Sequence, residues 1–121
     1  MTRRSDCPVA CVLDLMGDKW TLLILRDMIF FNKRLFYEFL DSPEKIATNT
    51  LTDRLHKMEQ AGIIIKEPYS SHRYRYAYKL TEAGEELKPI LTSIGKWGLK
   101  HIDKTTTPLL AAKNRQAAEA E

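Results

Sequence analysis

The sequence predicts one small domain of the α+β class that is mainly helical. The chain has 121 residues, the size of a single domain. Most of its apolar residues recur at spacings of three and four, as in amphipathic helices, and one segment alternates as a pair of strands would. A chain of this length buries roughly two thirds of the surface exposed when unfolded, enough for a core without disulfides or a structural metal. Large two-domain enzymes are therefore excluded.

The charge is mild and the apolar stretches are short. The chain has 19 Lys and Arg and 16 Asp and Glu, which gives a net charge of +3. A net charge this small does not identify a binding partner, so the partner has to be inferred from where the charges lie. The longest apolar stretches, 22–25 and 28–31, fall far short of the roughly 20 residues that a membrane span needs. The N-terminus also lacks the uninterrupted apolar core of a secretory signal, so we expect a cytoplasmic protein without a membrane segment.

The first half of the chain predicts two helices before a shorter third one. Apolar side chains at helical spacing predict a helix over residues 8–16, which Gly17 would end. Asp18 is suited to cap a second helix over 19–31, whose apolar residues cover most of its circumference. We expect this second helix to form the centre of the core.

The third and fourth helices are separated by a proline. Apolar pairs from Leu35 predict a short third helix that ends at Ser42 and Pro43, because the residue before proline avoids helical geometry. A fourth, amphipathic helix is predicted over 48–61, with Gly62 as its stop. Its inner stripe is formed by Leu51, Leu55 and Met58.

The second half predicts a hairpin and a closing helix. Residues 63–69 and 74–80 have the form of two antiparallel strands joined by a polar turn. Thr81 would then cap a long helix to about Ile102. Pro89 should kink this helix unless it falls in an early turn, where its missing hydrogen bond costs little.

This order of elements is that of a winged helix-turn-helix with a two-stranded wing and a long C-terminal dimerisation helix. We expect the domain, including N- and C-terminal dimerisation helices, to cover residues 1–104. Residues 105–121 become rich in alanine and charge and should form a flexible tail.

Particular sequence stretches sharpen this expectation. In chain order they are Cys7-Pro8, LDLMGDKWTLLIL at 13–25, Ile46, LTDRL at 51–55, EQAGII at 59–64, YAYKLTEAG at 76–84, Leu87-Lys88-Pro89 and Trp97-Gly98. Together they resemble the HxlR-type transcriptional regulators, relatives of the MarR group. The resemblance implies a dimeric DNA-binding regulator, most simply a repressor, without catalytic activity or a cofactor.

Two positions depart from the family pattern. The family usually has a Gly-rich turn and an Arg-Phe-Ser-Glu-Leu type sequence before its third helix, where this chain has NKRLFYEF at 32–39. The extra aromatic residues there would alter the approach to DNA or line a modified pocket. A serine commonly begins the recognition helix, but Ala47 stands in that place, which leaves Thr48 or Asn49 to cap.

The fourth helix is the candidate reader of the major groove, because its outer face offers short polar side chains to base edges. The candidate residues are Thr48, Asn49, Thr52, Asp53, His56 and Lys57. Asn49 could pair bidentately with adenine, and Lys57 would lie near the phosphate backbone. The alternative is an amphipathic helix whose polar face is merely solvated.

The hairpin and the segment before the third helix carry the other DNA-contact candidates. They are Lys33, Arg34, Ser71, His72, Arg73 and Arg75. Guanidinium groups at a hairpin tip suit phosphate or minor-groove contact. An edge-protecting charged hairpin is the alternative, and Arg75 could instead pair with a glutamate. We interpret Tyr74, Tyr76 and Tyr78 as core packing rather than base stacking.

The apolar stripe of the last helix is larger than a two-stranded hairpin can cover. We therefore expect a homodimer whose recognition helices lie about one DNA turn apart and bind an inverted repeat. The expected interface residues are Val9, Leu13, Ile90, Ile94, Trp97 and Ile102.

Cys7 is the candidate redox sensor. It begins the first helix, where the helix dipole with Arg3 and Arg4 would lower its pKa. In HxlR-type regulators a cysteine at the matching position often senses oxidants or electrophiles, so the resemblance implies this role. A buried, inert thiol is the alternative.

Cys11 lies one helical turn beyond Cys7. A disulfide between the two would strain a regular helix, so a bridge would join two subunits or follow local unwinding. With three scattered histidines the pair is poor evidence for a metal site. Two other functions stay open: a small-molecule effector without a thiol switch, and a winged helix that binds proteins.

Overall fold

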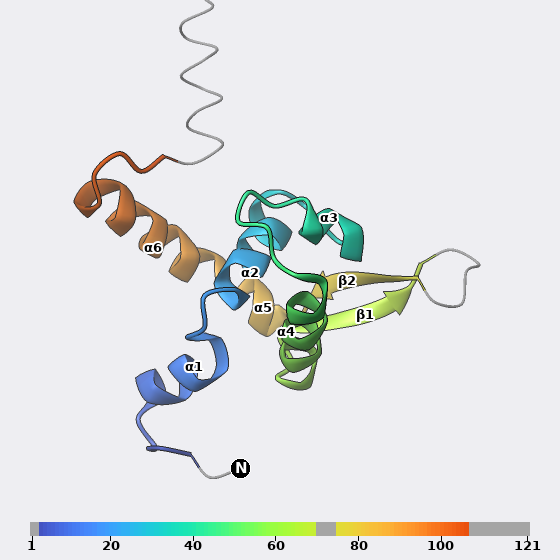
Figure 1. Ribbon diagram of the computed structural model, residues 1–121. Helices are drawn as coiled ribbons and strands as arrows, with labels where there is room; N and C mark the ends of the chain where they lie inside the picture. Colours follow the sequence, from blue (N-terminus) through green and yellow to red (C-terminus); the bar gives the residue numbers. More distant parts are fainter. Residues whose placement is uncertain (1–2, 70–74, 107–121) are drawn as a thin grey trace, which may run out of the picture. The chain divides into compact units, whose positions relative to one another are not determined.

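The computed structural model describes residues 3–69 and 75–106 (Figure 1). Within them the chain forms six helices and a two-stranded antiparallel sheet. In chain order the elements are α1 (Pro8–Met16), α2 (Thr21–Phe30), α3 (Phe36–Leu40), α4 (Thr48–Gln60), β1 (Ile64–Pro68), β2 (Tyr76–Leu80), α5 (Glu82–Glu85) and α6 (Lys88–His101). This confirms the predicted winged helix-turn-helix order. None of the described helices combines the length and apolar character that crossing a membrane requires.

The elements fall into two compact units, one ending at Lys88 and the other beginning at Pro89. The break corrects one expectation. The long C-terminal helix is present, but it begins at Lys88 instead of running unbroken from Thr81, and α5 forms a separate short helix. Pro89 explains the restart because it occupies the first turn of α6, where a missing N–H removes no intrahelical hydrogen bond. The rest of the predicted tail, 107–121, lies outside the described residues.

The core of the first unit is built around α2, as predicted. Ile24, Leu25 and Met28 of α2 are buried, together with Phe39 of α3. The inner stripe of α4 is also buried, and it consists of Leu51, Leu55 and Met58. Helix α4 and strand β1 are in contact, so the hairpin lies beside α4 (Figure 1).

Two glycines end helices for different reasons. Gly62 follows α4 with a φ of +77°, in the left-handed region that favours glycine. Gly17 follows α1 with an ordinary φ of −85°. A Cβ at Gly17 would lie 2.4 Å from the Leu13 carbonyl oxygen, so steric space and not backbone conformation requires glycine there.

The segment before α3 extends the hairpin. β1 and β2 pair antiparallel, with Ile64 opposite Leu80. Leu35 forms an isolated antiparallel bridge to Ala77, and the Tyr78 N–H donates to the Arg34 carbonyl at 2.8 Å. The start of α3 is therefore attached to the free edge of β2. The Tyr78 ring packs edge-to-face on the core residue Phe39, as the core interpretation of this tyrosine expects.

A buried carboxylate joins α2 to the segment between α3 and α4. Asp27 is 3% exposed, and its carboxylate accepts hydrogen bonds from Arg26 Nε at 3.1 Å and Nη2 at 3.0 Å. It also accepts from the Ser42 hydroxyl and lies 3.5 Å from Lys33 Nζ. Arg26 in turn binds Glu44 through two hydrogen bonds of 2.8 Å. The loop that leads into α4 is thus held against α2 by charge-assisted hydrogen bonds.

Replacing this carboxylate should destabilise the domain strongly. Asp27→Ala would leave Lys33 and Arg26 without their buried partner, which should lower the free energy of unfolding by about 3 kcal/mol. Chemical denaturation monitored by circular dichroism measures the loss. Asp41→Ala removes an exposed carboxylate from the same loop and serves as the control. Equal stability of the two variants would contradict the role given to Asp27.

Candidate nucleic-acid interface

The predicted polar face of α4 is exposed to solvent. Leu51, Leu55 and Met58 hold the opposite face in the core. The six candidate residues on the outer face are all exposed: Thr48, Asn49, Thr52, Asp53, His56 and Lys57. The helix therefore has the anchored inner stripe and free outer face that a major-groove reader needs.

Asp18 binds both the start of α2 and the side of α4. The predicted N-cap is wrong by two residues, because α2 begins at Thr21 with Trp20 in the N-cap position. Asp18 Oδ2 nevertheless accepts hydrogen bonds from the Trp20 N–H at 2.9 Å and the Thr21 N–H at 3.0 Å, so it pairs two free donors at this helix start. The same oxygen forms an ion pair with Arg54 Nε of α4 at 3.3 Å. Partial burial opposes ionisation of Asp18, but the Thr21 hydroxyl, the backbone N–H groups and Arg54 outweigh it and lower the pKa.

The N-terminus of α4 lacks a side-chain cap. Its N-cap residue is Ala47, so the expectation that Thr48 or Asn49 would take this place is wrong. The helix begins at Thr48 because the backbone of Ala47 already has the extended geometry of an N-cap. Asn49 Oδ1 accepts the Thr50 N–H at 3.1 Å, and the Thr52 hydroxyl donates to the Thr48 carbonyl at 3.0 Å. The positive end of the helix dipole thus lies beside the candidate contact residues.

The charges farther along α4 partly neutralise one another. Asp53 Oδ2 lies 3.4 Å from Lys57 Nζ, a pair one turn apart, and 3.7 Å from Arg54 Nη1. The repulsion that Asp53 would exert on a phosphate is thereby reduced. His56 lies beside this group and is exposed.

The hairpin candidates are only partly described. Ser71, His72 and Arg73 lie outside the described residues, as does Tyr74. Arg75 is exposed and forms no ion pair with any described residue. Its strand neighbour Lys79 instead pairs with Glu67 of β1 at 3.0 Å.

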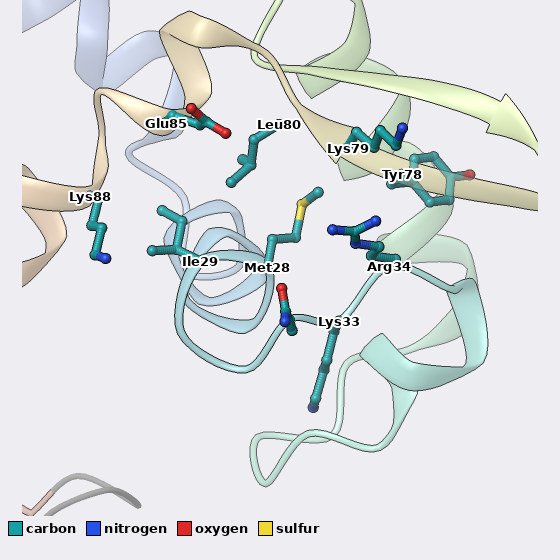
Figure 2. A pocket seen from close by; sticks show the side chains of 10 residues that line it. Met28, Ile29, Lys33, Arg34, Tyr78, Lys79, Leu80, Glu85 and Lys88 are labelled. Atoms are coloured by element: carbon teal, nitrogen blue, oxygen red, sulfur yellow. The ribbon is translucent and has the colours of Figure 1, made fainter.

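Lys33 and Arg34 differ in what surrounds them. Besides Asp27, Lys33 Nζ contacts the Ser42 hydroxyl at 3.2 Å and the Asp41 carbonyl at 3.4 Å. The Arg34 guanidinium forms no ion pair within the described part of the chain and is exposed. Figure 2 shows the Lys33 side chain extending away from Arg34, which turns toward a cavity of about 640 Å³ bordered by Met28 and Leu80. Of the two residues, Arg34 is the one whose charge is uncommitted.

The capping of α3 was not foreseen from the sequence. Glu38 Oε1 accepts the backbone N–H groups of Arg34 at 3.0 Å and Leu35 at 2.8 Å. These two hydrogen bonds lower the pKa of Glu38. They also fix the backbone from which Arg34 projects.

Cys7 is exposed and occupies the N-cap position of α1. The backbone N–H groups of Ala10 and Val9 lower the pKa of its thiol. Arg4, which was expected to contribute, is engaged elsewhere, because its Nε donates to Asp14 at 2.6 Å. The helix terminus itself is therefore the main cause of the lowered pKa.

Cys11 is less exposed, and its Sγ lies 3.5 Å from the Ser5 carbonyl. Over residues 3–69 and 75–106, no group of three His, Cys, Asp or Glu side chains could hold a metal ion.

Two helices expose large apolar side chains. In α6 none of the residues is buried. Trp97 is 61% exposed, and Ile90, Ile94 and Ile102 are each about half exposed. In α1 only Met16 is buried, whereas Val9 is 67% and Leu13 55% exposed. Each helix thus carries apolar surface that its own unit leaves uncovered.

Comparisons with known proteins agree with this architecture. A family model described as HxlR-like helix-turn-helix matches residues 15–106. The uncharacterized HTH-type transcriptional regulator sll1512 of Synechocystis is 38% identical over 98 residues, which cover 81% of this chain and 72% of that protein. The uncharacterized HTH-type transcriptional regulator YdeP of Bacillus subtilis is 37% identical over 100 residues, with 83% and 77% covered.

Two solved structures of a regulator have the same fold. The reduced form of the redox regulator HypR superimposes with a TM-score of 0.71 at 32% identity, covering 80% of this chain and 95% of that one. Its oxidised form gives a TM-score of 0.70 at 33% identity, with 80% and 99% covered. These relatives are named as regulators, and the matching family is not a catalytic one. The chain therefore belongs to the HxlR-like helix-turn-helix family, and it is a transcriptional regulator of the winged-helix, DNA-binding type.

Proposed function

We propose that the protein is a homodimeric repressor that acts in the cytoplasm and binds an inverted-repeat operator. The observation that carries this proposal is the exposed polar face of α4, anchored from behind by buried leucines and held at Asp18 by Arg54. Asn49 at its start would read a base edge, while Arg34 and Arg75 would contact phosphates. Ser71, His72 and Arg73 would extend the phosphate contacts at the hairpin. A promoter occupied by such a dimer is closed to transcription, which makes repression the simplest outcome.

The dimer is supported by the uncovered apolar side chains of α1 and α6. Leaving Val9 and Trp97 more than half exposed costs hydrophobic free energy that association would recover. Interfaces between identical subunits commonly use a twofold axis, so the same faces would meet from both copies. A twofold dimer would present two α4 helices to two half-sites of opposite orientation.

We further propose that oxidation of Cys7 controls DNA binding. Its thiol is exposed and its lowered pKa raises the share of the reactive thiolate. HypR, whose structure resembles this chain, is named as a redox regulator, and its structure has been solved in reduced and oxidised forms. A disulfide between Cys7 at the N-cap and Cys11 one turn into α1 would strain the helix, so we place the bond between the Cys7 thiols of the two subunits. In that reaction two thiols lose two protons and two electrons to the oxidant as one S–S bond forms.

Removing the proposed base-reading amide should weaken operator binding. Asn49→Ala should raise the Kd for the DNA upstream of the protein's own gene by about ten-fold or more, because a bidentate pair to adenine is lost. Fluorescence anisotropy at several salt concentrations measures the Kd, which should rise with salt for every variant. Gln60→Ala, at the opposite end of α4, is the matched control. Equal affinity of the unaltered protein for this DNA and an unrelated duplex would count against the operator.

A charge on the exposed face of α6 should dissociate the dimer. Ile94→Asp would place a carboxylate in the proposed apolar interface, where burying it without a partner is costly. Sedimentation equilibrium should give twice the 14.0 kDa chain mass for the unaltered protein and a single chain mass for the variant. Lys96→Asp introduces the same group on the other side of α6 and should remain dimeric. A monomeric unaltered protein at micromolar concentration would refute the proposal.

Oxidation should act through Cys7. Mild diamide treatment should abolish operator binding by the unaltered protein and by Cys11→Ser, whereas Cys7→Ser should keep its affinity. Non-reducing electrophoresis should show a covalent dimer only where Cys7 is present. Binding by the unaltered protein that persists after complete thiol oxidation would rule out the switch and leave the DNA-binding proposal intact.

A further inference from the structure

A second cavity, of about 680 Å³, lies between the start of α3 and the hairpin. Its lining includes five aromatic rings, contributed by Phe36, Tyr37, Tyr69, Tyr76 and Tyr78. The volume lies within the range of small-molecule sites, which are typically lined by apolar and aromatic side chains with a few polar groups. This is also the part of the chain in which the sequence departs from its family pattern.

Two of these rings are exposed to solvent and are not part of the core. Tyr37 is 67% exposed and Tyr69 45% exposed, so neither contributes much to the core. Their rings nevertheless border the same cavity as the half-buried Tyr76 and Tyr78. A lining with this many aromatic rings favours a planar aromatic ligand, which can stack on a ring or meet it edge to face.

The charges around the cavity favour an anion. Arg75 lines it and forms no ion pair with the described residues. Lys66 Nζ lies 4.7 Å from the centre of the Tyr76 ring, which adds a second positive charge nearby. No Asp or Glu is among the described lining residues. These two positive charges would repel a cationic ligand, so the cavity is not an aromatic cage for a cation.

The backbone around the cavity is fixed by hydrogen bonds. The bridge between Leu35 and Ala77 and the hydrogen bond from Tyr78 to Arg34 join the start of α3 to β2. At the other end the Tyr69 N–H donates to the Arg75 carbonyl at 2.7 Å. A site whose walls are already ordered loses less conformational entropy when it binds a ligand.

We infer that this cavity binds a small planar aromatic anion, such as an aromatic carboxylate of one or two fused rings. The rings would stack on the organic part, and the Arg75 guanidinium would bind the carboxylate through paired hydrogen bonds. Because Arg75 is also a proposed phosphate contact, a ligand that occupies it should change DNA affinity. This last consequence rests on the proposed function, whereas the binding site itself does not.

Calorimetric titration of the full-length reduced protein with 2-naphthoate tests the site. One molecule per chain should bind. Arg75→Gln should weaken binding by about ten-fold or more, because a charge-assisted interaction is lost. Tyr37→Ser, at an exposed position where the fold should tolerate it, should weaken binding by about three-fold. Lys79→Gln removes a cation from the same strand but outside this cavity, and should bind naphthoate like the unaltered protein.

Three further ligands discriminate the chemistry. Cyclohexanecarboxylate lacks the aromatic ring and 2-naphthylmethanol lacks the charge, so both should bind more weakly than 2-naphthoate. Phenyltrimethylammonium should not bind. Absence of naphthoate binding, equal binding by Arg75→Gln, or preference for the neutral or cationic compound would each overturn the inference.

The link to DNA is measured separately. Naphthoate should shift the operator Kd of the unaltered protein, whereas Tyr37→Ser should keep the ligand-free Kd and respond less. If naphthoate binds and the operator Kd stays constant, the coupling is refuted. If naphthoate binds and the protein has no DNA affinity, the proposed function fails while the ligand site stands.

Discussion

The buried carboxylate of Asp27 is the interaction on which the position of the reading helix depends. Burying a charge that is only 3% exposed is costly unless the charge is paired. The partners of Asp27 come from α2 itself and from the segments before α3 and α4. Arg26 and Lys33 supply the cations, and Ser42 supplies a hydroxyl donor from the loop that precedes α4. Apolar packing would hold that loop near α2 without fixing its register. Directional hydrogen bonds fix it, because a shift of one residue would separate Ser42 from Asp27 and Glu44 from Arg26.

A second carboxylate, Asp18, performs the same task at the other end of α2. One oxygen accepts two backbone N–H groups at the start of α2 and also faces Arg54 of α4, so the start of the central helix and the middle of the reading helix share a single anion. The apolar stripe of α4 decides which face is buried, whereas this ion pair restricts sliding along its axis. Since a displacement of about 1.5 Å moves a helix by one residue, such restraint determines which side chains face outward at a given height.

The sequence predicts the fold well wherever the signal is local. Helical periodicity places α4, and Gly62 ends it as predicted with a positive φ. The same periodicity predicts the polar outer face, since it requires only knowledge of which side is apolar. Contacts distant in sequence were not predictable: the bridge from Leu35 to Ala77 and the pairing of Arg26 with Glu44 depend on tertiary packing. For the same reason Lys33 resembled Arg34 in the sequence, although only Lys33 is bound by Asp27.

Internal pairing of cations limits how much charge is left for DNA. Lys33, Lys57 and Lys79 each lie beside a carboxylate, so the count of 19 Lys and Arg overstates the positive charge that is free to meet a phosphate backbone. Among the described residues, Arg34 and Arg75 have guanidinium groups that form no ion pair, and the N-terminus of α4 adds the positive end of its dipole. A single chain would bind DNA more weakly than a dimer, because it contacts only one half-site. In the proposed dimer the second copy binds at high effective concentration, so total affinity depends steeply on the spacing of the two reading helices. A bond at Cys7 therefore needs to alter only this spacing to change operator occupancy. A ligand beside the hairpin would act more directly, because it would occupy Arg75, which is also a proposed phosphate contact.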